Sequence, residues 1–236
     1  MLLAILAGRV SKGAVKKAKE AASNPVRARR EEEKEQRRQA IIDAAEEVIA
    51  KHGWEDTNFG EIAKRSRLSR SLVYFYFPDR EELFHAVCER GLSSMLRRFE
   101  TALAKNKTGL DQIMAIGRAY YAFSLAEPLH FEILSRMQAQ ESDPATQSDT
   151  VKNAEERGRG CLVLVAQALA NGLADGSIRK SIGDPGPTAV SVWAFTHGLI
   201  QISAQKEAML KKDFNLSAAK TMEHGFALLR GSLAAT

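Results

Sequence analysis

The stretch that decides the fold lies at 57–83 and reads TNFGEIAKRSRLSRSLVYFYFPDREEL. Thr57 can cap a short helix, because its hydroxyl can accept a hydrogen bond from an unpaired backbone amide of the first turn. Ser69 can cap a second short helix over 70–76 in the same way. That helix stops at Pro78, since proline disfavours helical backbone in the residue before it. The stretch therefore predicts two short helices joined by a tight turn.

Longer helices flank this pair on both sides. Upstream, Pro25 suits the first turn of a helix that should end near Gly53, a residue that tolerates left-handed backbone. Downstream, Asp79 and Glu82 have the spacing of a capping box and open a long helix that ends near Ala104. Apolar residues then recur at helical spacing, which predicts further helices at 109–126, 128–140, 150–174, 186–211 and 216–233. The chain is therefore expected to be all-α.

The two short helices and the longer helix before them have the pattern of a helix-turn-helix unit. In such a unit the first short helix buries one face and holds the second rigidly, so that the second can present its N-terminus to a DNA groove. The expected buried face comprises Ile62, Ala63, Leu68, Val73 and Phe77.

A family resemblance lies within residues 37–85. It is carried by Ile41-Ile42-Asp43-Ala44-Ala45, His52-Gly53-Trp54, Thr57, Ile62-Ala63, Leu68-Ser69 and Val73-Tyr74-Phe75-Tyr76-Phe77-Pro78-Asp79-Arg80-Glu81-Glu82-Leu83. These residues and their spacing resemble the DNA-binding domain of TetR-family transcriptional regulators. The resemblance implies a three-helix DNA-binding domain followed by a larger helical domain that binds a ligand and dimerises. It also implies a homodimer on palindromic operator DNA, as a repressor released by a small-molecule effector; an activator and an effector-independent structural DNA-binding protein are the alternatives.

The second short helix and its flanks supply the predicted DNA contacts, which are Thr57, Arg67, Ser69, Arg70, Ser71, Leu72, Tyr74, Phe75, Tyr76 and Arg80. Arg70 can place its guanidinium on the major-groove edge of guanine, or contact a phosphate instead. Ser69 and Tyr74 carry hydroxyls that can bind phosphate, with helix capping and core packing as the alternatives. Arg67 occupies the turn position that is usually Gly in the family. Either the turn backbone differs, or Arg67 is tolerated because it reaches a phosphate.

The candidate effector-pocket residues combine bulk with isolated polar tips: Met114, Tyr120, Tyr121, Phe123, Phe131, Met137, Trp193, His197 and Gln201. Trp193, His197 and Gln201 share one helix face, which could line a pocket or lie in a dimer seam. A helical core contains the same mixture of residues. The helices at 186–211 and 216–233 are the expected dimer contact, forming a four-helix bundle with their symmetry mates. The effector is expected to be largely apolar.

The charge of the chain is unevenly distributed. The 236 residues include 34 Lys and Arg against 29 Asp and Glu, a net charge of +5. Residues 1–30 hold eight basic side chains and one acidic side chain, so the basicity belongs to this segment. We expect a basic extension at 1–30, mobile or helical, a DNA-binding domain at 31–80 and an effector-binding and dimerisation domain at 81–236.

Several other classes of protein are disfavoured by the sequence. No apolar run is long enough to span a membrane, and two distant cysteines disfavour a disulfide scaffold or a cysteine-rich zinc site. The five histidines lack metal-ligand spacing, and no catalytic cluster stands out in 105–236, as an all-α enzyme or carrier would need. We therefore expect a cytoplasmic protein that is not an enzyme and needs no cofactor or metal.

Overall fold

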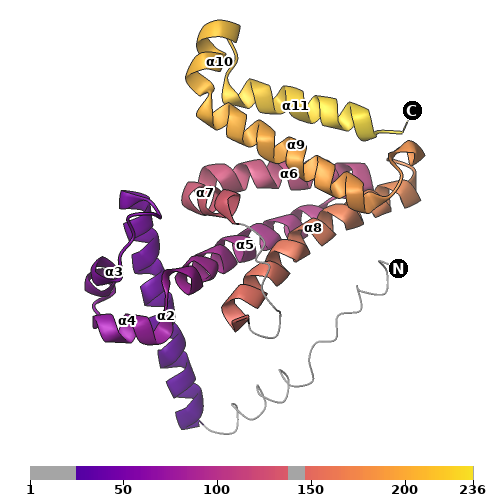
Figure 1. Cartoon of the computed structure of the whole chain (residues 1–236). Coiled ribbons are helices and arrows are strands. Elements are labelled where there is room, and N and C mark those ends of the chain that lie inside the picture. The colour runs from indigo at the N-terminus through magenta and orange to yellow at the C-terminus, as the bar shows by residue number, and fades with distance from the viewer. Residues whose placement is uncertain (1–24, 138–146, 236) are drawn as a thin grey trace. The chain divides into compact units, whose positions relative to one another are not determined.

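The computed structural model describes residues 25–137 and 147–235, which divide into two compact units, one ending at Pro78 and the other beginning at Asp79. The first unit holds α2 (Pro25–His52), α3 (Phe59–Ser66) and α4 (Arg70–Tyr76). The second unit holds α5 (Arg80–Lys105), α6 (Gly109–Ala126), α7 (Pro128–Arg136), α8 (Asp149–Asp175), the short 3-10 helix η2 (Lys180–Ile182), α9 (Pro185–Gln205), α10 (Glu207–Phe214) and α11 (Ala218–Leu233). The all-α prediction is confirmed (Figure 1).

The core of the first unit forms where the apolar face of α2 meets α3 and α4. Ile41, Ala45 and Val48 recur at helical spacing along α2 and are fully buried. Ile62 of α3 and Val73 of α4 are fully buried as well. The helix-turn-helix is therefore held by apolar packing on one side, which leaves the other side of α4 free.

The second unit is a layered helical bundle. Helices α5 and α8 run side by side along its centre, and α6 packs against both of them (Figure 1). Helix α9 lies on α8, and α11 lies on α9. No helix among the described residues is long and apolar enough to cross a membrane.

The start of α6 lies directly against the end of α8. A Cβ added to Gly109 would overlap the backbone nitrogen and Cα of Gly172, so only glycine permits this approach. The loop after α8 caps α6, because Asp175 Oδ2 accepts from Gly109 N at 2.7 Å and Ser177 Oγ accepts from Leu110 N at 3.1 Å. Gly176 ends α8 with φ of 77°, a left-handed value suited to glycine.

Two features of the helices differ from those expected. The N-cap of α3 is Asn58, whose side chain accepts from Glu61 N at 2.9 Å, rather than Thr57. The helix expected at 186–211 is broken at Lys206, where φ of −112° and ψ of 16° separate α9 from α10. No glycine or proline marks this break, and Leu210 of α10 is buried beyond it.

Two other expected segments extend beyond the described residues. The helix expected at 128–140 ends at Arg136, and 138–146 lie outside the description. Of the basic extension expected at 1–30, residues 25–30 belong to α2, and 1–24 lie outside the description.

Replacing Gly109 tests the contact between α6 and α8. Gly109→Ala should lower the free energy of unfolding by about 1–3 kcal/mol, because the new methyl group meets backbone that cannot rotate away. The control is Gly158→Ala in α8, where the nearest atom to the new methyl group would be Leu92 Cδ1 at 3.8 Å. Urea unfolding of both variants measures the difference, and equal stabilities would contradict the proposed close packing.

Candidate functional site

The N-terminus of α4 is exposed and capped in the way the sequence predicts. Ser69 Oγ accepts from Leu72 N at 3.2 Å and lies 3.0 Å from Ser71 Oγ. Arg70 and Ser71 are exposed in the first turn, whereas Val73 anchors the opposite face of the helix in the core. A rigidly held helix with short polar residues and an arginine at its exposed start can enter a DNA major groove.

Arg67 adopts the left-handed backbone of the turn between α3 and α4. Its φ of 57° and ψ of 32° place it in the region that glycine occupies at least cost. The structure thus settles one of the sequence alternatives: the turn backbone is the left-handed one, and an arginine occupies it. Neither Arg67 nor Arg70 forms an ion pair with a residue that the structure describes, in contrast to Arg65, which pairs with Glu47 and Glu61.

The aromatic residues of α4 are divided between packing and exposure. The Tyr74 ring packs 4.7 Å from the Phe59 ring, yet 44% of Tyr74 is exposed, so its hydroxyl can reach outward. Phe75 is 72% exposed, which is unusual for a residue with no polar group. Leu72 and Tyr76 are half-buried. The guanidinium of Arg70 lies over the Tyr74 ring, with Cζ 5.8 Å from the ring centroid. This contact limits the directions in which the Arg70 side chain can extend.

Thr57 is buried, whereas Arg80 is exposed. Thr57 is 3% exposed, and its hydroxyl donates to Gly53 O at 2.9 Å, so the side chain is engaged inside the first unit. The Thr57 hydroxyl proton is therefore not available for the phosphate contact predicted from the sequence. Arg80 is exposed at the start of α5, where Asp79 caps the helix by accepting from Glu82 N at 2.8 Å.

The second unit encloses a cavity of about 680 Å³. Its walls come from α5, α6, α7, α8 and α9, together with Met137 just after α7. Apolar side chains make up most of the wall: Leu92, Met95, Phe99, Ile113, Ile116, Leu134, Leu162, Val165 and Val192. A cavity of this size and lining is typical of a site for a small apolar molecule.

A small polar group interrupts the apolar wall. The Tyr120 hydroxyl lies 2.8 Å from His197 Nδ1, and the two rings stack at 6.1 Å. Burial raises the pKa of Tyr120 to about 12 and lowers that of His197 below its usual value. Both side chains are therefore neutral near pH 7, and the charged cavity residues are Glu155 and Arg159 of α8.

Four of the nine residues predicted for the effector pocket line the cavity: Tyr120, Met137, Trp193 and His197. The remaining five, Met114, Tyr121, Phe123, Phe131 and Gln201, are not among the lining residues. Met114 and Phe123 are fully buried in the helical core instead. Phe131 packs against two residues of the cavity wall. Its ring centroid lies 5.6 Å from that of Tyr120 and 5.3 Å from that of His197.

Sequence reasoning missed the contribution of α5 and α8. Leu92, Met95 and Phe99 of α5 have the three-to-four-residue spacing of any core face, which carries no signal of a cavity. Gly158 and Arg159 lie in a glycine-containing run for which no phosphate loop was predicted. Their place in the cavity wall depends on how α8 packs.

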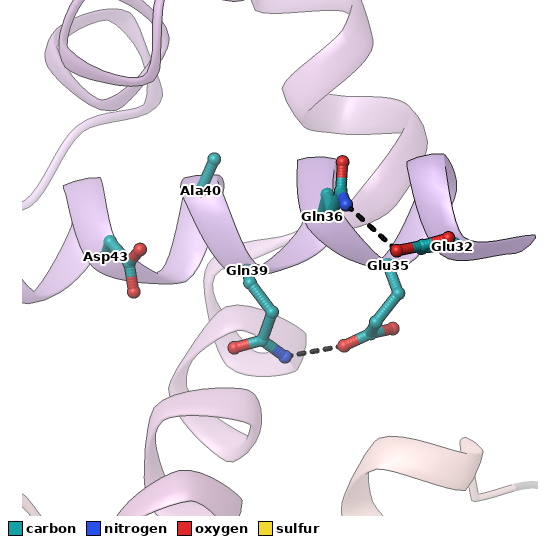
Figure 2. Close-up of a pocket in the computed structure, with 6 residues that line it drawn as sticks. All are labelled: Glu32, Glu35, Gln36, Gln39, Ala40 and Asp43. Atoms are coloured by element: carbon teal, nitrogen blue, oxygen red, sulfur yellow. Dashed lines mark hydrogen bonds between the residues drawn. The ribbon is translucent and has the colours of Figure 1, made fainter. Parts of the chain in front are cut away.

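A second hollow lies on the surface of α2 and is lined by six residues of that helix: Glu32, Glu35, Gln36, Gln39, Ala40 and Asp43 (Figure 2). Gln36 donates to Glu32 at 3.5 Å and Gln39 donates to Glu35 at 2.6 Å, so polar groups pair within the helix. One exposed helix face encloses nothing, and we assign no ligand to it.

A part-buried polar cluster joins α5 to α7. Burial alone would raise the pKa of Glu127, but hydrogen bonds from Ser94 at 2.6 Å and Arg98 at 2.8 Å, with the positive charge of Arg98 and the nearby His130, hold it below its usual value. Glu127 precedes α7, so this cluster fixes the start of the helix that carries Leu134 and Ser135 to the cavity.

Comparisons with known proteins match both units. The family described as bacterial regulatory proteins, tetR family, matches residues 41–87, and the tetracyclin repressor-like C-terminal domain matches 113–229. The fatty acid metabolism regulator protein of Bacillus subtilis strain 168 is 22% identical over 142 residues, covering 60% of this chain and 71% of that protein.

Solved structures with the same fold include two complexes with coenzyme A thioesters. The transcriptional regulator FadR from Bacillus subtilis in complex with stearoyl-CoA has a TM-score of 0.63 at 17% identity, covering 82% of this chain and 98% of that one. AibR in complex with isovaleryl coenzyme A and operator DNA has a TM-score of 0.59 at 17% identity, covering 81% and 97%. At these identities the likeness shows the fold.

The two family models together span more than half of the chain, and the first includes the exposed recognition helix. Regulators of this family are DNA-binding proteins that are not enzymes. The chain is a member of the TetR family of transcriptional regulators.

Proposed function

We propose that this regulator is a repressor that binds a palindromic operator as a homodimer and releases it when an effector fills the cavity of the second unit. In helix-turn-helix dimers the two recognition helices enter major grooves one DNA turn apart, about 34–36 Å. The exposed start of α4 in one unit and the apolar cavity in the other support the two halves of this proposal.

The roles on DNA follow from exposure and chemistry. Arg70 reads a guanine edge, because its guanidinium is exposed in the first turn of α4 and forms no ion pair with a described residue. Arg67, Ser69 and Tyr74 contact phosphates on either side of that groove. Ser71, Leu72, Phe75 and Tyr76 complete the predicted surface, with the apolar members able to meet thymine methyl groups. Arg80 adds a cation at the start of α5.

The effector proposed for this cavity carries an acyl chain. The mainly apolar lining favours a hydrocarbon body. Two proteins of the same fold have stearoyl-CoA and isovaleryl coenzyme A in the descriptions of their structures, which supports an acyl thioester here. Leu92, Met95 and Phe99 of α5 line the cavity, and the same helix begins directly after Pro78, where the DNA-binding unit ends. A shift of α5 on filling the cavity could therefore change the spacing of the recognition helices.

The dimer contact is proposed on α9, α10 and α11. These helices expose large apolar side chains that a monomer would leave in water: Val190, Trp193, Phe195, Ile202, Met209, Phe214 and Leu228. Two copies joined through these helices would form a four-helix bundle in which α9 and α11 are the main members.

Arg70→Ala should weaken operator binding about 5- to 150-fold, the equivalent of about 1–3 kcal/mol, and weaken binding to random duplex far less. The operator can be recovered by selection from a random duplex pool, and fluorescence anisotropy then measures both affinities. Lys64→Ala is the matched control, because Lys64 is an exposed cation of α3 predicted to form only a solvated face. Equal losses on both DNAs for Arg70→Ala would contradict base reading.

Filling the cavity should abolish the response to effector while leaving DNA binding intact. Gly158→Leu projects a side chain toward the cavity next to Leu92, and Gly158→Ala is the small control. With stearoyl-coenzyme A and isovaleryl-coenzyme A as probes, at least one should release wild-type protein and the alanine variant from the operator, but not the leucine variant. Failure of both probes to release wild-type protein would count against an acyl thioester effector.

Charges placed on the exposed apolar face should separate the dimer. Ile202→Glu combined with Leu228→Glu should give a monomer in sedimentation velocity and weaken operator binding at least 100-fold, because both half-sites must be held together. Leu125→Glu, at a residue that is 65% exposed on α6, is the control and should remain dimeric. A double variant that stays dimeric would exclude this face.

A further inference from the structure

The polar group in the cavity has a defined direction of proton donation. The Tyr120 hydroxyl lies 2.8 Å from His197 Nδ1, and its proton has no other acceptor among the described residues. Tyr120 therefore donates to His197 Nδ1, since a neutral imidazole can accept at that nitrogen. Because burial raises the pKa of Tyr120 to about 12, that proton is retained across the neutral pH range.

This direction fixes the tautomer of His197. A neutral imidazole carries one proton, and a ring whose Nδ1 accepts a hydrogen bond must carry it on Nε2. Burial lowers the pKa of His197, which favours the neutral ring. The opposite tautomer would donate from Nδ1 to Tyr120 and leave the tyrosine proton without an acceptor among the described residues.

The Nε2–H group has no partner within the part of the chain that the structure describes. Among the described residues the ring makes its one polar contact through Nδ1, and Nε2 keeps accessible surface. His197 lines the cavity, and its other neighbours there are the rings of Phe131 and Trp193. A donor beside apolar walls is costly to leave unpaired once a ligand displaces water.

We infer that His197 Nε2–H binds a neutral carbonyl oxygen of the effector, so that the cavity selects a lipophilic ester, thioester or ketone over an amine. Tyr120 is the positioning residue that holds the donor in place through its hydrogen bond to Nδ1, and the Trp193 ring packs beside the imidazole. The inference rests on the proposed function, since it assumes that the cavity takes the effector. An amine bearing a positive charge has no lone pair to accept from Nε2–H, and a carboxylate would be buried beside a neutral imidazole.

The test uses the full-length protein and the apolar fluorescent probe N-phenyl-1-naphthylamine, which lacks a carbonyl group. Competitors of matched chain length are methyl decanoate, sodium decanoate and decyltrimethylammonium bromide. At pH 8, methyl decanoate should displace the probe with the highest affinity of the three competitors, and the ammonium compound with the lowest. His197→Leu should weaken methyl decanoate about tenfold without weakening the apolar probe, whose own affinity is measured directly for each variant. His197→Gln, which keeps a donor near Nε2, should recover most of the loss.

The pH arm distinguishes an ester from a free acid. Decanoate should bind more tightly as pH falls from 8 to 6, because a protonated His197 would pair with it. The affinity of methyl decanoate should not rise over the same range. The other titratable groups lining the cavity are Tyr120 of α6 and Glu155, Arg159 and Cys161 of α8. In His197→Leu the gain for decanoate should disappear, which separates His197 from these groups.

The direction of the donor chain has its own readout. In 15N spectra of the imidazole nitrogens, with His197→Gln assigning the resonances, wild-type protein should show the Nε2–H tautomer. Tyr120→Phe should remove this preference and weaken methyl decanoate about threefold to tenfold, leaving the affinity of the probe unchanged.

The failures of the two proposals are distinguishable. If neither the probe nor any decanoyl compound binds wild-type protein, the cavity is not an effector site, and both the inference and the proposed function are wrong in this respect. If the compounds bind and His197→Leu leaves the affinity of methyl decanoate unchanged, or decanoate binds more tightly than its ester at pH 8, the inference alone is overturned.

Discussion

The second unit depends on the backbone contact between the start of α6 and the end of α8. Gly109 and Gly172 allow the two helices to meet without side chains between them, and Asp175 and Ser177 then cap α6 from the loop that ends α8. Because the helices are fixed at this end, Ile113, Ile116 and Tyr120 of α6 face α8 at defined positions further along. The cavity is the space that remains between them, with α5, α7 and α9 closing it.

The two units differ in how their apolar side chains are packed. In the first unit the apolar faces of α2, α3 and α4 are buried against one another, which holds α4 in place and leaves its polar start and the Phe75 ring exposed. The second has an apolar cavity of about 680 Å³ that is partly open to the surface, and it exposes large apolar side chains on α9 to α11. A cavity and an uncovered apolar face both lower the free energy of unfolding. That free energy rises again when a ligand fills the cavity or another protein surface covers the face. This is consistent with a domain that responds to occupancy.

Much of the DNA-binding unit could be predicted from the sequence because its signals are local. The cap at Ser69, the stop at Pro78 and the buried Ile62, Val73 and Phe77 each depend on residues within a few positions. The cap of α3 was misplaced by one residue, since Thr57 and Asn58 are both good capping types and only the backbone decides between them. The break at Lys206 could not be predicted, because no glycine or proline at that point of the sequence opposes a continuous helix.

The helical class and the helix-turn-helix could be predicted from the residues alone, as could the polar tips of the bulky side chains Tyr120, Trp193 and His197. That these three side chains meet depends on how the helices pack. Tyr120 and His197 are 77 positions apart, and their 2.8 Å contact exists because α9 and α6 both pack on α8. Periodicity shows which face of a helix is apolar, but it does not distinguish a face that fills space from one that encloses it. That difference arises from how far apart the helices are held.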